Sequence, residues 1–506
     1  MLNQIPYVIR LTYRFVGVFK RGLVGLSMVE SLRDRLFPNT PDSAAKLWLT
    51  SAVVWGVFGM SLGVFMAILF VFPDFTKGVP WLSFSRIRPT HVNMVALVWV
   101  SMASVGAMFY MLPRLLKTPL VSERLATFAG WSFNAFALCI PLTLLNGLSE
   151  GREWAELVWW MDWWMLINLG IVGYLTFATV ANRKEPQLYV SVWYWMGSMV
   201  GITIVWLVGN RTFVPLDGLN DAIANWFYAH DVLGLWITTM GIGIIYYLLP
   251  KLTVGKNGEP GNPIFSHKLS LIGFWGNFAF YTGIGTHHII QAPVPEWLKA
   301  FAIASSVLMS IPVYSASANF FLSTQGRWEN LVWNLPLRFV TFGWMMYALA
   351  SFQGSLQSVR SINWYQHFTG IVSAHAHLAM LGGFSVVLFA AVYYCIPRLY
   401  KVEWYSKKLV VVHFWTFTVS FVMFFIVWTT MGFVQASSWV MGINVQQTVP
   451  FLQPFTFVRM IAALSMIFSV YIFAYNLLQT VRSAKRQEAS QRILVPAPVA
   501  AAAADD

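Results

Sequence analysis

Residues 367–396 have the sequence HFTGIVSAHAHLAMLGGFSVVLFAAVYYCI. This stretch carries His375 and His377 in its first half but no lysine, arginine, aspartate or glutamate. A helix needs about 20 predominantly apolar residues to cross the hydrocarbon core of a bilayer, so the stretch predicts a membrane-spanning helix. An ionisable side chain inside such a helix is costly, which makes both histidines functional candidates.

The rest of the chain has the same character. Of its 506 residues, 57% are hydrophobic and 10% are charged, whereas a soluble domain has about 25% charged residues. So few charges could not cover the surface of a soluble protein of this length, which excludes soluble enzymes and nucleic-acid-binding proteins. We predict an all-α membrane protein, a bundle of twelve transmembrane helices, and find no convincing internal repeat. The predicted helices are residues 47–73, 89–113, 124–148, 155–182, 188–210, 222–250, 268–291, 297–323, 335–358, 367–396, 408–435 and 455–481.

The charged residues predict the orientation and the domain organisation. The net charge of +13 comes mainly from the tails and from loops on one side of the predicted bundle. Basic loops face the cytoplasm, so both termini are predicted to be cytoplasmic, and the charge requires no nucleic acid as partner. We predict a basic interfacial segment at 1–46, the twelve-helix domain at 47–482 and a disordered tail at 483–506.

Six of the nine histidines are predicted to lie at a similar depth. Four lie early in helices that run from outside to inside, and two lie late in a helix that runs the other way. All six therefore lie toward the outer side, although an isolated histidine on an apolar helix is usually a hydrogen-bonded packing residue. The six are His91, His230, His287, His288, His375 and His377.

The spacing of these histidines separates two kinds of site. His375 and His377 lie about 200° apart around a helix, so they face opposite ways and can serve two cofactors that flank the helix. His91 is a plausible second axial ligand for one of these cofactors. The adjacent His287 and His288 could both reach one metal near a helix end.

His230 would supply a third imidazole to that metal, and three neutral imidazoles suit copper, iron or zinc. The interpretation is two haems and one three-histidine metal. The only cysteines, Cys139 and Cys395, lie in apolar stretches, so the sequence has no disulfide framework, no cysteine-based metal site and no CxxCH haem-attachment motif.

These motifs resemble the haem–copper oxidase superfamily, and within it the catalytic subunit of cbb3-type (C-family) cytochrome c oxidases. Each motif alone is weak, but their order and spacing together are specific, and the resemblance spans roughly residues 47–480. The motifs are RIRPTH at 86–91, WFYAH at 226–230, YTGIGTHH at 281–288 and HAH at 375–377.

The resemblance implies roles for the histidines and their neighbours. His91 and His377 would be the axial ligands of low-spin haem b, and His375 the proximal ligand of high-spin haem b3. A copper ion, CuB, would be held by His230, His287 and His288. Residues expected near the haem propionates are Arg88 and His367, with Arg360 and Trp364 as weaker candidates.

A tyrosine assigns the subfamily. In the A and B families, the active-site tyrosine follows the first copper histidine by four residues, where this chain has Gly234. C-family enzymes carry the tyrosine on the seventh helix, and Tyr281 occupies that position. The resemblance implies a covalent link between Tyr281 and His230. It also implies a single proton route from the cytoplasm toward Tyr281, with Tyr247 and Asn277 along it.

The implied activity is the reduction of O2 to water by electrons from cytochrome c, coupled to proton uptake and pumping in the inner membrane of a bacterium. Because the chain has no c-type haem motif, the resemblance implies partner subunits that carry c-type haems. Three residues depart from the family pattern, which indicates a divergent member. They are Asp231 in place of asparagine, Gln353 in place of glutamate and Gly273 in place of histidine.

Two alternatives remain open. A nitric oxide reductase would use the same three histidines for non-haem iron, but such enzymes usually add a glutamate at the position of Gly234. A twelve-helix solute transporter would show internal repeats and a polar site at the midplane of the membrane, and the sequence shows neither.

Overall fold

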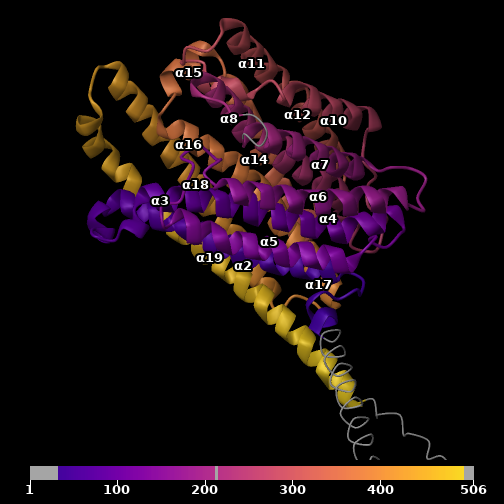
Figure 1. Cartoon of the computed structure of the whole chain (residues 1–506). Helices are drawn as coiled ribbons and strands as arrows, with labels where there is room; N and C mark the ends of the chain where they lie inside the picture. Colours follow the sequence, from indigo (N-terminus) through magenta and orange to yellow (C-terminus); the bar gives the residue numbers. More distant parts are fainter. Residues whose placement is uncertain (1–31, 211–214, 495–506) are drawn as a thin grey trace, which may run out of the picture.

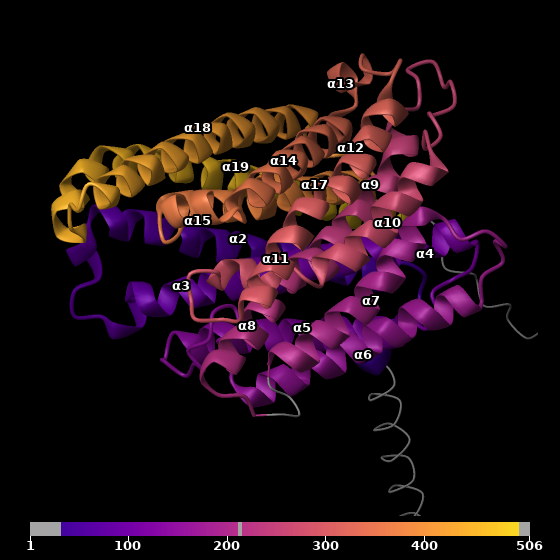
Figure 2. The same ribbon diagram turned by 90° about the horizontal axis from the view of Figure 1, so that it is seen from above.

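The computed structural model describes residues 32–210 and 215–494, which form a bundle of helices without strands in that part of the chain (Figures 1 and 2). The helical fold class is thereby confirmed. Most of the predicted interfacial segment lies in residues 1–31, outside the described residues. The helix α2 begins at Ser43 and contains the predicted domain boundary at residue 46.

Helices occupy all twelve predicted ranges, but ten helical stretches of the described chain are long and apolar enough to cross a membrane. The ranges without such a stretch hold α10, with only 15 residues, and α14. The count of twelve spanning helices is therefore not reached on length and composition. Besides the three central helices described next, the bundle contains α2 (Ser43–Val71), α5 (Glu123–Leu144), α6 (Trp159–Ala181), α7 (Val190–Gly209), α10 (His267–Tyr281), η5 (Gly285–Ile289), α11 (Glu296–Leu308), α12 (Ser310–Thr324), α13 (Asn330–Trp333), α14 (Leu335–Gln357), α15 (Arg360–Gln366), α18 (Lys407–Val440) and α19 (Val445–Leu494).

Three central helices are almost entirely buried, and each follows the same plan. Each carries its histidines near the start and then widens into a π-helical stretch, a feature that is frequent at functional sites. This repetition is an internal repeat that we did not find in the sequence. The three are α3–η3–α4 (Phe84–Val92, Asn93–Trp99, Val100–Leu116), α8–η4–α9 (Gly218–Val232, Leu233–Thr238, Thr239–Leu252) and α16–η6–α17 (Gly370–His377, Leu378–Ser385, Val386–Tyr400).

The opposite ends of the central helices also repeat. We call this end of the bundle the basic end and the other the histidine end. At the basic end each helix places a cation over a tyrosine four residues earlier, and the three buried tyrosine rings lie together. The pairs are Arg114 over Tyr110 at 3.6 Å, Lys251 over Tyr247 at 4.8 Å and Arg398 over Tyr394 at 3.7 Å, and the Tyr394 ring lies 6.4 Å from Tyr110 and 6.1 Å from Tyr247.

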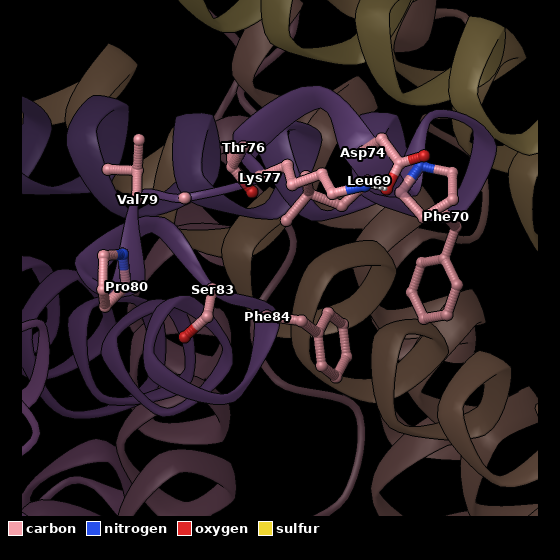
Figure 3. A pocket seen from close by; sticks show the side chains of 11 residues that line it. Leu69, Phe70, Asp74, Thr76, Lys77, Val79, Pro80, Ser83 and Phe84 are labelled. Carbon is pink, nitrogen blue, oxygen red and sulfur yellow. Dashed lines mark ion pairs between the residues drawn. The ribbon is translucent and has the colours of Figure 1, made fainter.

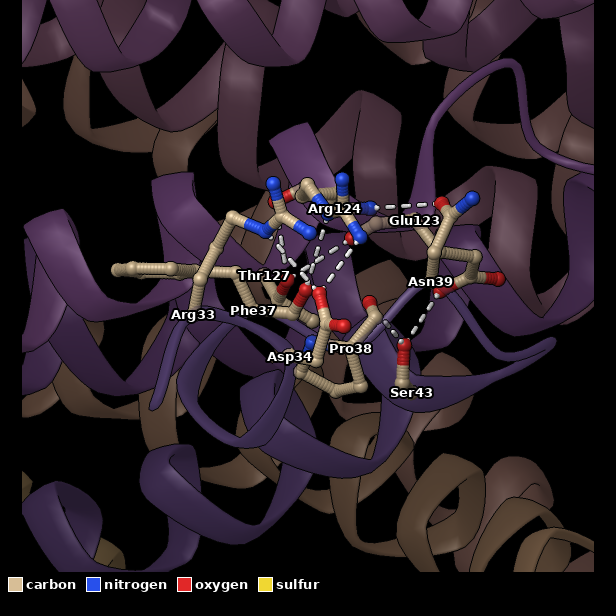
Figure 4. A network of polar contacts seen from close by, with 9 residues as sticks. All are labelled: Arg33, Asp34, Phe37, Pro38, Asn39, Ser43, Glu123, Arg124 and Thr127. Atoms are coloured by element: carbon tan, nitrogen blue, oxygen red, sulfur yellow. Dashed lines mark hydrogen bonds and ion pairs between the residues drawn. The ribbon is translucent and has the colours of Figure 1, made fainter. Parts of the chain in front are cut away.

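A polar network ties the chain before α2 to the start of α5 (Figure 4). The Glu123 carboxylate accepts hydrogen bonds from the backbone N–H groups of Asp42 (2.8 Å) and Ala44 (2.9 Å). These are unpaired donors at a helix start, where a negative charge is favourable. Arg124 adds an ion pair with Asp34 at 2.9 Å. Residues of two helices therefore share one cap.

The last helix, α19, continues to Leu494, past the predicted boundary at residue 482. Residues 483–494 are thus helical where the sequence predicts disorder. Residues 495–506 lie outside the described part of the chain, where the disordered tail stays a prediction.

Candidate functional site

Three of the predicted histidines form a compact cluster at the histidine end. His230 comes from α8, whereas His287 and His288 come from η5. Their ligand atoms lie within 4.8 Å of one another. The short 3-10 turn η5 follows the end of α10 and directs two adjacent imidazoles toward α8. The cluster has the size and donor type of a three-imidazole metal site.

Neighbouring side chains hold these imidazoles in place. Nδ1 of His287 is hydrogen-bonded to Oγ of Ser306 at 2.7 Å, which leaves Nε2 of that ring for a ligand. The His288 ring stacks on Trp226 with ring centres 4.3 Å apart. Nδ1 of His230 is buried and has no hydrogen-bond partner among the described residues. A buried polar atom without a partner fits a missing ligand such as a metal ion.

Tyr281, the last residue of α10, lies against this cluster. Its ring centre is 5.3 Å from that of His230, and it lines one cavity together with Thr238. A Cβ atom added to Gly234 would lie 1.9 Å from Cδ1 of Tyr281. The tyrosine ring therefore fills the space that a side chain at position 234 would need.

His375 lines the same cavity as Tyr281. Two of the three clustered histidines, His230 and His287, also line this cavity. Nδ1 of His375 is hydrogen-bonded to Oε1 of Gln353 at 3.3 Å, so Nε2 remains for a ligand. A Cβ atom on Gly354 would approach the His375 ring to 3.2 Å. The departure at Gln353 thus lies next to the predicted proximal histidine, where a neutral amide replaces the expected carboxylate.

A second cavity lies on the other side of the helix, between His91 and His377. The two rings are nearly parallel, at 13°, with centres 6.5 Å apart. Each Nδ1 is hydrogen-bonded at 2.8 Å to a backbone carbonyl, of Gly59 and Ser373 respectively, which leaves both Nε2 atoms free. An iron bound about 2 Å from each nitrogen would place the ring centres about 6 Å apart. The spacing and the free nitrogens fit a haem with two axial imidazoles.

Of the two residues predicted near the haem propionates, Arg88 lines a histidine cavity and His367 does not. Arg88 lines the His91–His377 cavity, and its guanidinium forms a two-pronged ion pair with Glu153, with Nη1 3.1 Å from Oε2. His367 is half-buried beside Phe368, their ring centres 3.9 Å apart, and it does not line either histidine cavity among the described residues.

The two weaker candidates point elsewhere. Nη2 of Arg360 forms an ion pair with Oε2 of Glu296 at 2.6 Å. The Trp364 side chain is 64% exposed. Neither residue lines a histidine cavity in the described part of the chain.

Arg459 on α19 is a site residue that the sequence analysis missed. It is buried and lines the His91–His377 cavity. Its guanidinium lies 4.6 Å from the ring centre of Phe70 and 4.5 Å from that of Trp428. It forms no ion pair with a described carboxylate. The signal was available, because Arg459 is the single charged residue in the predicted helix 455–481.

The two residues predicted along the proton route, Tyr247 and Asn277, lie in different surroundings. Tyr247 faces Tyr394 and Lys251 at the basic end, whereas its neighbour Tyr246 accepts a hydrogen bond from Nδ2 of Asn319 at 3.2 Å. The same Asn319 amide donates to Oγ of Ser270 at 2.9 Å. Tyr246 therefore belongs to a buried polar group and Tyr247 does not.

Asn277 lies beside η4, and its Nδ2 donates to the carbonyl of Gly234 at 3.4 Å. Asp231, the second departure, is fully buried, and neither of its carboxylate oxygens has a hydrogen-bond partner among the described residues. Gly273 lies beside Tyr194, whose hydroxyl would be 3.2 Å from an added Cβ atom.

A pocket of about 510 Å³ lies next to the His91–His377 cavity, in the connection between α2 and α3 (Figure 3). Phe70 and Phe84 line both spaces, with ring centres 5.2 Å apart. Its charged residues, Asp74 and Lys77, form an exposed ion pair at 4.0 Å. Two aromatic rings thus form the wall between this pocket and the cavity.

Comparisons with known proteins agree with this geometry. The chain is 29% identical over 455 residues to the cbb3-type cytochrome c oxidase subunit CcoN1 of Stutzerimonas stutzeri, covering 86% of this chain and 94% of that protein. It is 28% identical over 475 residues to a cytochrome c oxidase subunit 1 homolog of Agrobacterium tumefaciens (strain T37), covering 90% of this chain and 86% of that protein.

A cryo-EM structure of a heme-copper terminal oxidase dimer has the same fold, with a TM-score of 0.71 and 16% identity over 87% of this chain and 84% of that chain. Residues 43–465 match the family model of Cytochrome C and Quinol oxidase polypeptide I. The match covers most of the chain and all six histidines of the two cavities. The chain therefore belongs to the family of cytochrome c and quinol oxidase polypeptide I.

Proposed function

We propose that this chain is the catalytic subunit of a terminal respiratory oxidase, a cytochrome c oxidase that reduces O2 to water. The observation that carries the proposal is the position of Tyr281, which fills the space over Gly234 and lies against His230 in the three-histidine cluster. A phenol next to a metal site and a haem site suits a reaction that needs four electrons and four protons in one encounter.

The donor sets support specific cofactors. His91 and His377 would hold low-spin haem b, His375 would hold high-spin haem b3, and the cluster of His230, His287 and His288 would hold copper. When bound, the haem–copper pair supplies the oxygen-binding site and the electrons of the reaction.

The protein's own side chains orient these ligands and supply protons. Ser306 fixes the tautomer and orientation of His287, and Trp226 restrains the ring of His288. Tyr281, which lines the same cavity as His230 and His287, would offer a phenolic proton beside the cluster. Its proximity to His230 supports the covalent link that the resemblance implies.

Two further roles follow from the contacts around the cavities. Arg459, a buried cation without a carboxylate partner among the described residues, would be the counter-ion for a haem b propionate. The buried group of Tyr246, Ser270 and Asn319 supports a second proton route from the basic end, beside the one predicted through Tyr247.

Nitric oxide reductase is the second candidate, and the packing of Gly234 speaks against it. A glutamate at position 234 would collide with Tyr281, so the fourth ligand that such enzymes usually give to iron has no place here. The solute transporter has no support from the site, because the six predicted histidines lie around two cavities at one end of the bundle.

Metal analysis of the purified protein tests this proposal, together with a reduced-minus-oxidised optical spectrum and turnover on O2 and NO. We expect copper, two b-type haems and a preference for O2. Iron without copper, with NO as the preferred substrate, would replace the oxidase by the reductase. The absence of b-haem bands would contradict both.

The remaining expectations belong to the whole complex. We propose cytochrome c as the electron donor, partner subunits that carry c-type haems, and a bacterial inner-membrane location with both termini in the cytoplasm. The relation to cytochrome c oxidase subunits and the spanning helices support these assignments.

A further inference from the structure

One face of α10 carries polar side chains from the basic end of the bundle to Tyr281. The three buried residues of this helix are Ser270, Gly273 and Asn277. Steps of three and four residues keep these positions on one side of a helix, and Tyr281 follows after four more. Gly273 interrupts this polar face, because it is the one member of the four without a polar side chain.

The hydroxyl of Tyr194 lies at this interruption. Tyr194 comes from α7 and is fully buried. A Cβ atom added to Gly273 would lie 3.2 Å from the Tyr194 hydroxyl oxygen, which is the nearest atom from another helix. Since Gly273 is also one of the three departures from the family pattern, the arrangement belongs to this chain in particular. At the level of Gly273, α7 supplies the polar group that α10 lacks.

Toward the basic end, Tyr194 adjoins a group that is already hydrogen-bonded. The amide of Asn319 donates to Oγ of Ser270 at 2.9 Å and to the Tyr246 hydroxyl at 3.2 Å. The ring of Tyr246 is stacked on that of Tyr194, with ring centres 5.9 Å apart and an angle of 22° between the planes. Tyr194 therefore continues this buried polar group to the level of Gly273.

Toward the histidine end, two buried polar atoms face the next step of the helix without a partner. Neither the Tyr194 hydroxyl nor Oδ1 of Asn277 has a hydrogen-bond partner among the described residues. Gly273 and Asn277 are four residues apart, about 6 Å along the helix axis. One water that accepts from Tyr194 and donates to Asn277 spans this distance with two hydrogen bonds of about 2.8 Å. Buried waters typically join such otherwise unpaired groups.

Packing between helices does not account for the Tyr194 hydroxyl. Polar side chains in membrane helices commonly form hydrogen bonds to a neighbouring helix. The Tyr194 hydroxyl forms no such bond to a described residue, and a buried polar group without a partner is costly. A phenylalanine would fill the same space without that cost, so packing alone favours phenylalanine at this position.

We propose that Tyr194 is a positioning residue for proton uptake, whose hydroxyl holds a water that carries protons past Gly273 toward Tyr281. The Tyr194 hydroxyl gives its proton to this water and takes one from the side of Tyr246, so only O–H bonds break and form. Asn277 keeps the water in place, and the proton moves on to the cavity that Tyr281 lines. This inference rests on the proposed function, whose reaction consumes protons.

Tyr194→Phe tests the proposal, because it removes the hydroxyl and keeps the ring. In the purified complex we expect O2 turnover to fall at least fivefold and its solvent deuterium isotope effect to rise, with copper content and haem spectra unchanged. Adding Gly273→Ser returns a hydroxyl to the same space and should restore at least half of the wild-type turnover. The control Tyr393→Phe removes another buried hydroxyl, hydrogen-bonded to His413 at 2.9 Å, and should keep turnover within twofold of the wild type.

Wild-type turnover in Tyr194→Phe would overturn the proposal, as would a loss that Gly273→Ser does not restore or that leaves the isotope effect unchanged. If Tyr194→Phe lost its haems, Gly273→Ala and Gly273→Ser in the otherwise unsubstituted chain would replace it. Both add a carbon beside the Tyr194 hydroxyl, but only serine offers the water a hydroxyl. Turnover should be at least threefold lower with alanine than with serine, and equal rates would overturn the proposal.

The proposed function is tested separately by the copper, the haems and the O2 turnover of the unsubstituted complex. The reduction of NO also consumes protons. A chain that preferred NO would therefore contradict the proposed function, and the same variants, measured with NO, would still decide the role of Tyr194.

Discussion

Gly234 and Tyr281 share one small space next to the three-histidine cluster. They come from different helices, η4 and α10, yet a single added carbon on the glycine would lie 1.9 Å from the tyrosine ring. Overpacking of this kind costs about 1–3 kcal/mol and shifts side chains from their positions. Glycine at position 234 is therefore the condition under which Tyr281 can lie beside His230.

Gly234→Ala should displace Tyr281 from His230. We expect at least a tenfold loss of O2 turnover, with the optical spectrum of low-spin haem b retained. The matched control is Gly170→Ala on α6, where an added Cβ atom meets nothing within 4 Å. A similar loss in both variants would show that Tyr281 is not the cause.

His230→Ala should remove the copper and leave low-spin haem b intact, because His91 and His377 lie in a separate cavity. Metal analysis and the reduced-minus-oxidised spectrum measure both outcomes. His413→Ala is the control, since His413 is a buried histidine hydrogen-bonded to Tyr393 outside both cavities. Loss of both haems in His230→Ala would contradict the ligand assignment.

Arg459→Leu removes a positive charge from the wall of the His91–His377 cavity. A nearby cation favours the reduced haem, which carries one positive charge less, so the midpoint potential of haem b should fall. We expect a fall of roughly 60 mV, equivalent to a tenfold change for a one-electron couple. Redox titration followed optically measures it, and Arg459→Lys should restore most of the potential. Equal potentials in the wild type and Arg459→Leu would exclude the role.

Histidine positions could be predicted at this scale, but the orientation of the residues around them could not. Six histidines at one depth are visible because ionisable residues are rare in apolar helices. The difference between Tyr246 and Tyr247 is a rotation of about 100° about one helix. The sequence around them is apolar on every side, so no periodicity indicates which of the two faces the polar group.

At the scale of elements, the connection from α10 to η5 brings the adjacent histidines next to His230. The predicted helix 268–291 ends at Tyr281, and a 3-10 turn replaces its last part. Gly285 permits this, because a Cβ atom there would lie 2.4 Å from the carbonyl oxygen of Trp226 on α8. The length of an apolar stretch predicts a helix but carries no information about such a close approach. The position of the histidines along the chain could therefore be predicted, whereas the 3-10 turn that carries them could not.

The connection between α5 and α6 carries a buried carboxyl group, Glu156. Burial raises the pKa of this carboxyl group to about 7, although the hydrogen bond that it accepts from Asn93 lowers the pKa. Because the folded protein binds this proton more tightly than the unfolded chain, the free energy of unfolding should fall as the pH rises from about 4.5 to 7. A difference of about 2.5 pH units corresponds to roughly 3 kcal/mol.

Glu156→Gln should therefore flatten the pH dependence of the melting temperature of the detergent-solubilised protein between pH 5 and 8. Glutamine keeps an oxygen that can accept from Asn93 but does not titrate. We expect the variant to melt at a higher temperature than the wild type at pH 8 and at a similar temperature at pH 5. The same slope in both proteins would contradict the assignment to Glu156.

At the scale of the whole molecule, the two ends of the bundle are chemically different. The histidine end holds the two cavities, and the basic end holds the repeated cation–tyrosine pairs and the ion pairs of Arg114 and Arg124 with Asp42 and Asp34. The composition indicates this division through the distribution of lysine and arginine. The repeat of the three central helices could be read in part from the sequence, because Tyr-x-x-Pro-Lys/Arg occurs at 110–114, 247–251 and 394–398. The π-helical stretches have no such motif, so that part of the repeat could not be predicted.

The charge distribution predicts which end faces the cytoplasm, and reporter fusions can measure it. A reporter that is active only in the cytoplasm should be active when fused after Leu494, and one that needs export should be inactive there. The opposite result would invert the molecule in the membrane. It would also place the two histidine cavities toward the cytoplasmic side.

The three cation–tyrosine pairs at the basic end have an electrical consequence. A proton entering along the central axis would meet Arg114, Lys251 and Arg398 above a layer of packed, buried rings. Each charge that crosses a membrane holding 100 mV releases about 2.3 kcal/mol, so a leak through the centre would dissipate the gradient as heat. The repeated pairs thus place three positive charges, which repel a proton, at the basic end of the central axis.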